Sequence, residues 1–164
     1  DRLLADGDFV RHMTTTWSNL LIGRNPAPPV DRAAFQQHLR LAFAENRPWN
    51  VMVAELLSAE GRTDEQGATN YLVAHLNNQA VPATAITSRL FLGQQLHCAQ
   101  CHNHPFNPYQ QAAFWELNSL FQQTEVLTGD AVRRAFPQME AREARRGPAV
   151  AALVTQAEGG PIYY

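Results

Sequence analysis

Residues 96–106 carry the sequence LHCAQCHNHPF, which contains the only two cysteines in the chain of 164 residues. Cys98 and Cys101 are separated by two residues, and His102 follows the second cysteine directly. Cys-x-x-Cys-His is the attachment pattern of a c-type haem. The two thiols add across the two vinyl groups of one porphyrin, and the adjacent imidazole coordinates the iron from the proximal side. The pattern therefore predicts one covalently attached haem c per chain, with His102 as the proximal iron ligand.

Other uses of two nearby cysteines fit the surrounding sequence less well. A redox-active Cys-x-x-Cys pair is typical of a βαβ setting, and no such pattern surrounds Cys98 and Cys101. A zinc site could use these thiols with His102 or His104, but a structural zinc site normally takes its ligands from two separated pairs. A disulfide or two unrelated buried thiols are the remaining alternatives. The histidine directly after the second cysteine favours the haem.

The rest of the chain has mainly helical periodicity, in which apolar residues recur every three or four positions. Asp8 and Asp31 are predicted to cap helices, and Gly23 to end the first one. We expect a mostly α-helical domain wrapped around the haem over residues 1–158. Residues 159–164 would begin a following segment, with a short strand at Ile162. The predicted helices cover residues 8–22, 31–45, 50–58, 69–77, 82–96, 109–121 and 130–146, the last of them broken near Pro137.

Composition narrows the classes of function. Thirteen basic and fifteen acidic side chains give a formal net charge of −2, so no nucleic-acid-binding footprint is indicated. No apolar run approaches the roughly 18–20 residues of a membrane span. All the basic side chains are arginine, so the lysine ring by which many soluble cytochromes dock is absent. The chain starts at Asp1 rather than at a methionine, and we expect it to be a piece of a longer protein.

Residues 91–106, together with Phe114 and Trp115, resemble the planctomycete-type cytochrome c domain, a family of otherwise unknown function found in large secreted bacterial proteins. The resemblance extends over roughly residues 1–123 and implies a haem c outside the cytoplasm, in a periplasmic, secreted or cell-surface protein. It implies no reaction, because the family has no assigned catalytic residues. Cys98, Cys101 and His102 correspond to its haem-binding positions. His104 matches its Cys-His-x-His-Pro-Phe pattern without an assigned role.

A low-spin electron carrier needs a sixth iron ligand, usually a histidine or methionine. His75, on a predicted apolar helix face, and His12 are the leading candidates, although a histidine bonded within the core is the simpler interpretation of His75. His104 lies too near His102 to reach the opposite face of the same haem easily, so bonding to a propionate, to a backbone group or to a neighbouring subunit's haem is the expectation for it. An open sixth position is a further alternative. The weaker candidates are Met13, Met52, Met139, His38 and His97.

Arginine side chains can bind haem propionates through bidentate contacts. Arg89, predicted two turns before Cys98 on one helix, and Arg47 are the candidates, each with an ordinary surface or capping role as the alternative.

These observations predict an electron-transfer domain without catalytic residues, acting with an unknown redox partner. One alternative is a homo-oligomer or filament in which a neighbouring subunit's histidine completes the iron coordination. Another is a haem peroxidase or gas-binding domain, which requires an open sixth position.

Overall fold

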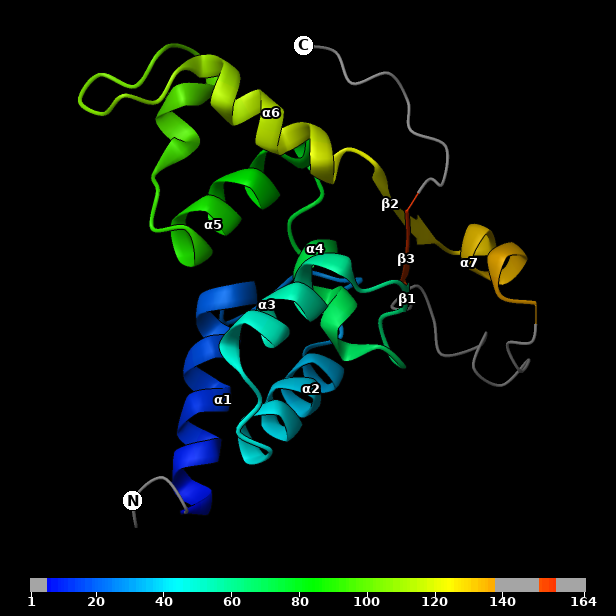
Figure 1. Cartoon of the computed structure of the whole chain (residues 1–164). Coiled ribbons are helices and arrows are strands. Elements are labelled where there is room, and N and C mark those ends of the chain that lie inside the picture. The colour runs from blue at the N-terminus through cyan, green and yellow to red at the C-terminus, as the bar shows by residue number, and fades with distance from the viewer. Residues whose placement is uncertain (1–5, 138–150, 156–164) are drawn as a thin grey trace. The chain divides into compact units, whose positions relative to one another are not determined.

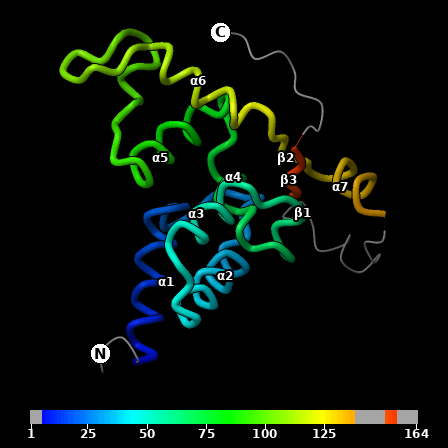
Figure 2. Tube along the Cα trace, viewed as in Figure 1, coloured from blue at the N-terminus to red at the C-terminus, as the bar shows by residue number. Residues whose placement is uncertain are grey.

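The computed structural model describes residues 6–137 and 151–155, and this part of the chain is mostly helical, as predicted. Figure 1 labels its elements, and Figure 2 follows the same trace from the first helix to the last strand. The α-helices are α1 (Gly7–Ile22), α2 (Arg32–Ala44), α3 (Trp49–Ser58), α4 (Asn70–Val73), α5 (Val81–Phe91), α6 (Gln111–Phe121) and α7 (Asp130–Ala135). The 3-10 helices are η1 (Gly67–Thr69), η2 (Asn78–Ala80) and η3 (Leu96–Gln100). The strands are β1 (Gly61–Arg62), β2 (Thr124–Thr128) and β3 (Ala151–Thr155).

The first two helices begin at aspartate caps, and the first helix ends at a glycine. Asp31 caps α2 as predicted, because its carboxylate accepts a hydrogen bond of 2.9 Å from the backbone N–H of Ala34. The cap of α1 is Asp6 rather than the predicted Asp8, since Asp6 accepts from the backbone N–H of Asp8 at 2.9 Å. Gly23 ends α1 with a φ of 80°, as predicted.

Two predicted helices are shorter than expected. The helix expected over residues 82–96 ends at Phe91, and Gly93 follows with a φ of 66°, outside the range of a right-handed helix. The helix expected over residues 69–77 consists of only η1 and α4. Asn78, Gln79 and Ala80 then have φ values of 48°, 56° and 58°, which reverse the hand of the backbone before α5 begins.

A three-stranded sheet with the order β1–β3–β2 was not predicted. β1 pairs antiparallel with β3, with Gly61 opposite Leu153 and Arg62 opposite Ala152. A strand of two residues carries no readable alternation of apolar and polar side chains, so the sequence pattern could not reveal β1. The predicted strand at Ile162 lies outside the described residues.

The chain divides into two compact units. Of the described residues, 6–74, 126–137 and 151–153 form what we call the N-terminal unit, and 75–125 with 154 and 155 form the motif unit. The fully buried apolar side chains of the N-terminal unit include Leu21, Phe35, Leu39, Met52, Leu56, Tyr71 and Leu153. The motif unit has a smaller core of Leu96, Ala99 and Phe114, against which Val81, Tyr109, Trp115 and Leu117 pack.

Candidate functional site

The Cys-x-x-Cys-His segment lies on η3 and the turn that follows it. A 3-10 helix has three residues per turn, so side chains three positions apart share a face. Leu96 and Ala99 are 4% and 0% exposed and pack on Phe114, whereas Cys98 is half-buried and Cys101 is exposed. The three-residue interval explains the spacing of the motif. Leu96 and Ala99 both point into the core, and Cys98 and Cys101 lie together on another face of the segment.

The start of α6 holds the segment in place. The backbone carbonyl of Gln100 accepts hydrogen bonds from Trp115 Nε1 and Gln111 Nε2, both at 3.1 Å. The Asn103 side chain accepts in turn from the backbone N–H of Gln111 at 2.9 Å. These bonds secure the backbone on both sides of Cys101. Asn103 and Gln111 were not predicted as site residues, because their only signal in the sequence is an amide side chain near a helix start.

His102 is exposed, and its Nδ1 lies 2.7 Å from the backbone carbonyl oxygen of Asn103. A carbonyl oxygen only accepts, so Nδ1 carries the proton and donates it. The neutral imidazole then has its lone pair on Nε2. Histidines that bind metals almost always donate the other ring N–H to a carbonyl or carboxylate in this way. The tautomer of His102 is therefore the one that an iron ligand requires.

The two thiols form no disulfide. Cys98 Sγ lies 3.5 Å from Nε2 of the exposed His97. Within residues 6–137 and 151–155, no group of three or more histidine, cysteine, aspartate or glutamate side chains is arranged to hold a metal ion. A haem iron needs fewer protein donors than such a cluster, because the porphyrin supplies four of its ligands.

Three other predicted site residues belong to the motif unit. His75 is half-buried in the turn after α4 rather than on a helix face, and its backbone carbonyl accepts from Ala83 at 3.1 Å. Arg89 is exposed in the last turn of α5, which ends before the cysteine segment, so the two are not on one helix. His104 is half-buried, and its Nδ1 accepts from the backbone N–H groups of Phe106 and Asn107 at 3.1 and 3.0 Å.

The remaining candidates belong to the N-terminal unit, except Met139, which lies outside the described residues. His12 is exposed on α1, and Met13 beside it is half-buried. Met52 is 2% exposed in the core, the position expected of a packing methionine.

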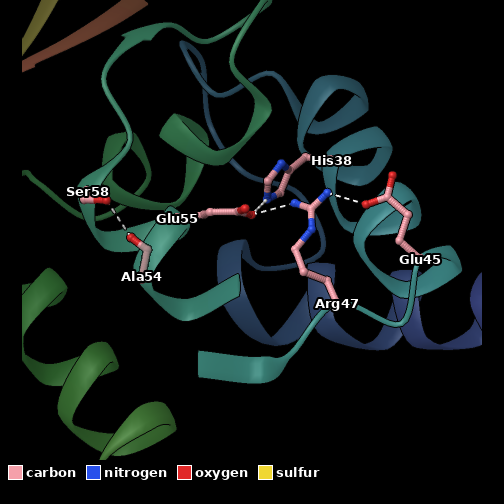
Figure 3. Close-up of polar contacts among 6 residues, drawn as sticks. All are labelled: His38, Glu45, Arg47, Ala54, Glu55 and Ser58. Carbon is pink, nitrogen blue, oxygen red and sulfur yellow. Dashed lines mark hydrogen bonds and ion pairs between the residues drawn. The ribbon is translucent and has the colours of Figure 1, made fainter. Parts of the chain in front are cut away.

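Arg47 lies between two carboxylates (Figure 3). Its Nη2 is 2.6 Å from Glu45 Oε2, and its Nη1 is 2.7 Å from Glu55 Oε2. The hydrogen bonds that Arg47 donates to Glu45 and Glu55 raise the pKa of Arg47 above its ordinary value. A haem propionate would have to compete with both partners, so the structure supports the alternative role of Arg47 as a structural ion-pairing residue.

His38 completes this cluster, with Nε2 3.5 Å from Glu55 Oε2. The approach meets the distance of an ion pair, but Nε2 is buried and makes no hydrogen bond within the part of the chain that the structure describes. At 3.5 Å the contact between His38 Nε2 and Glu55 is longer than a normal hydrogen bond, so Glu55 stabilises a proton on His38 only weakly. Burial lowers the pKa of His38 from its ordinary value of 6.5, Glu55 raises it, and Arg47 lowers it further.

The lowered pKa of His38 predicts a loss of stability in acid. Below pH 6.5 the unfolded chain binds a proton at this position that the folded protein resists, so the free energy of unfolding falls as the pH falls. Replacement of His38 by glutamine removes the titration and makes this dependence shallower. Urea denaturation at pH 7.5, 6.5 and 5.5 measures it in both proteins. Equal slopes for the two proteins below pH 6.5 would contradict the assignment.

No helix in the described residues is both long enough and apolar enough to cross a membrane.

Comparison with known proteins identifies one protein family. The model of the PSCyt2 family, described as a protein of unknown function (DUF1549), matches residues 1–126. No curated protein and no solved structure matches the chain.

Proposed function

The chain belongs to the PSCyt2 family, and we propose that it is a monohaem c-type cytochrome domain that transfers single electrons outside the cytoplasm. The observation that carries this proposal is the 2.7 Å contact between Nδ1 of His102, the residue directly after the cysteine pair, and the Asn103 carbonyl oxygen. Because a carbonyl oxygen only accepts, Nδ1–H donates to it and the lone pair of the neutral ring is on Nε2, and Cys98 and Cys101 form no disulfide. The resemblance to secreted cytochrome domains supports the extracytoplasmic location.

The donor set fits a haem c. Cys98 and Cys101 would form the two thioether bonds, and His102 Nε2 would ligate the iron. When bound, the haem would supply an iron centre that cycles between Fe(III) and Fe(II). The chain holds the attachment segment rigidly, because Gln111 and Trp115 of α6 both donate to the Gln100 carbonyl. Cys101 and His102 are exposed, so the segment is accessible to a redox partner, whose identity is unknown.

The sixth iron ligand distinguishes electron transfer from the alternatives. His75 is the leading candidate in the motif unit, and His12 is the leading candidate in the N-terminal unit. A histidine from a neighbouring subunit would produce a haem-linked oligomer, and an open position would permit peroxidase or gas-binding chemistry. Among residues 6–137 and 151–155, no contact favours either alternative over electron transfer.

The experiment is expression with export in a host that matures c-type cytochromes, with a known cytochrome c as the positive control. We expect a pyridine haemochrome spectrum of a haem with two saturated thioether bonds, and haem that stays on the polypeptide in a denaturing gel. Cys98→Ala and Cys101→Ala should each leave one thioether and shift the spectrum toward that of a haem with one vinyl group. The double variant should lose covalent haem entirely.

Gln95→Ala is a matched control, because Gln95 is an exposed residue just before η3 and should leave haem attachment unchanged. The proposal fails if the wild-type chain carries no covalent haem while the positive control matures normally. The spin state of the ferric protein tests the alternatives: a low-spin spectrum without added ligand contradicts an open sixth position. Low-spin character that disappears on dilution supports a ligand from a neighbouring subunit.

A further inference from the structure

We propose that His104 is a positioning residue of the haem-attachment segment, and that it controls which ring nitrogen of His102 carries the proton. The significance of this role rests on the proposed function, but the role itself concerns only the protein's own atoms. His104 lies two residues after His102 and makes a different set of contacts.

The side chain of His104 organises the turn that follows it. Its Nδ1 accepts the backbone N–H groups of Phe106 at 3.1 Å and Asn107 at 3.0 Å. The ring meets that of Tyr109 edge to face, with centroids 5.9 Å apart and planes at 88°. The backbone N–H of His104 donates to the Tyr109 carbonyl at 2.8 Å and closes the turn. Four residues of exposed loop are thereby held by one imidazole and one backbone hydrogen bond.

The turn is connected to His102 through a single peptide group. The peptide bond between Asn103 and His104 donates its N–H to the Tyr109 carbonyl, and its carbonyl oxygen receives the Nδ1–H of His102 at 2.7 Å. A peptide group is planar, so fixing its N–H also fixes the direction of its carbonyl. The turn that His104 organises therefore orients the acceptor that determines the tautomer of His102.

The two histidines consequently hold their protons on opposite nitrogens. His102 donates through Nδ1 and has its lone pair on Nε2, whereas His104 accepts through Nδ1 and in its neutral form has its proton on Nε2. The side-chain amide nitrogen of Asn107 lies 3.4 Å from His104 Nε2, and because two donors cannot bond each other, this tautomer requires the Asn107 amide to turn its oxygen toward Nε2. Iron ligation by His104 Nε2 would require the proton to move to Nδ1, opposite two N–H donors. This cost disfavours His104 as an iron ligand of a neighbouring subunit and accounts for the residue by a structural role instead.

Two substitutions separate the two ring nitrogens. Asparagine places Oδ1 where histidine has Nδ1, and asparagine readily accepts backbone N–H groups two residues further along the chain. Glutamine carries its carbonyl one bond further out, near the position of Nε2, and provides no acceptor at the Nδ1 position. His104→Asn therefore keeps the turn, and His104→Gln breaks it at similar polarity.

The readout is the tautomer of His102 in the haem-free protein, measured from the ¹⁵N shifts and two-bond couplings of its imidazole. We expect His102 to be protonated mainly at Nδ1 in the wild-type protein and in His104→Asn. In His104→Gln we expect the population to shift toward Nε2–H, the form that cannot ligate iron through Nε2. An unchanged His102 tautomer in His104→Gln, or a shift of equal size in both variants, would overturn the proposal.

A second measurement needs no variant and so does not depend on the variants folding. In the wild-type protein, His104 should show the opposite tautomer to His102, with Nδ1 unprotonated, and the amide protons of Phe106 and Asn107 should exchange slowly with solvent. Identical tautomers for the two histidines would refute the proposal. Because both measurements use haem-free protein, they give an answer even if the chain proves to bind no haem, and a missing haemochrome spectrum would refute only the proposed function.

Discussion

Gly67→Ala should lower the free energy of unfolding by about 3 kcal/mol or more, because overpacking against immobile atoms is the costly form of a small-to-large substitution. Gly67 begins η1 and is buried against α2. A Cβ atom there would clash with the carbonyl oxygen of Ala34 and would lie 2.9 Å from the carbonyl carbon of Ala34 and 2.8 Å from His38 Cβ. Two of these neighbours are backbone atoms of α2, so the obstruction cannot be relieved by a side-chain rotation.

Thermal unfolding followed by circular dichroism measures this effect, and a loss of that size corresponds to a fall in Tm of about 6–12 °C for a chain of this length. Two glycines serve as controls. Gly7→Ala meets nothing within 4 Å and should leave Tm unchanged or slightly raised. Gly93→Ala also has open space but a φ of 66°, so it should cost only the backbone strain of about 1–2 kcal/mol. If Gly67→Ala lowers the free energy of unfolding by no more than Gly93→Ala does, the close packing of η1 against α2 is contradicted.

Asn70→Asp should destabilise the N-terminal unit by about 3–5 kcal/mol, the typical cost of a buried charge without a partner. Asn70 is 0% exposed and connects three parts of the chain. Its Nδ2 donates to the backbone carbonyls of Thr63 and Gly67 at 2.8 and 3.0 Å, and its Oδ1 accepts from the backbone N–H of Asp31 at 2.6 Å. An aspartate would place a carboxylate oxygen opposite two carbonyl oxygens.

Urea denaturation at pH 7 measures the loss, and Asn77→Asp at an exposed position is the matched control, expected to stay within about 0.5 kcal/mol of the wild type. Burial and the two carbonyls raise the pKa of the introduced carboxyl group, so protonation relieves the repulsion. The difference in free energy of unfolding between variant and wild type should therefore shrink as the pH falls from 7 to 5. A difference that is small at pH 7, or that grows in acid, would contradict the hydrogen-bond assignment of Asn70.

Helix positions were the most predictable part of the fold. Asp31 begins α2 and Gly23 ends α1 through contacts within a few residues, and such local contacts are visible in a sequence. The end of α5 was not predictable, because the apolar pattern continues past Phe91 to Leu96 although the backbone turns at Gly93. The pairing of β1 with β3 places Gly61 opposite Leu153. These residues are far apart in the sequence, so no local pattern predicts that they pair.

In the candidate site, too, some features could be predicted from the sequence and others could not. The spacing of Cys98, Cys101 and His102 alone was enough to predict a haem c, because the chemistry of attachment depends on residue types at fixed intervals. The role of His104 could not be inferred from that spacing. A histidine next to a motif is a potential ligand until the partners of each ring nitrogen are known, and those partners are backbone groups of Phe106 and Asn107.

Residue types and their spacing thus determine the helical class of this protein and predict which three side chains would hold the proposed haem, since both depend on interactions between near neighbours in the chain. Tertiary structure decides which hydrogen-bond partners the ring nitrogens of His102 and His104 have. The proton of His102 is positioned by the Asn103 carbonyl, and that carbonyl is oriented by the hydrogen bond from His104 to Tyr109. Tautomers depend on the direction of hydrogen-bond partners in space, and direction appears only once the chain has folded.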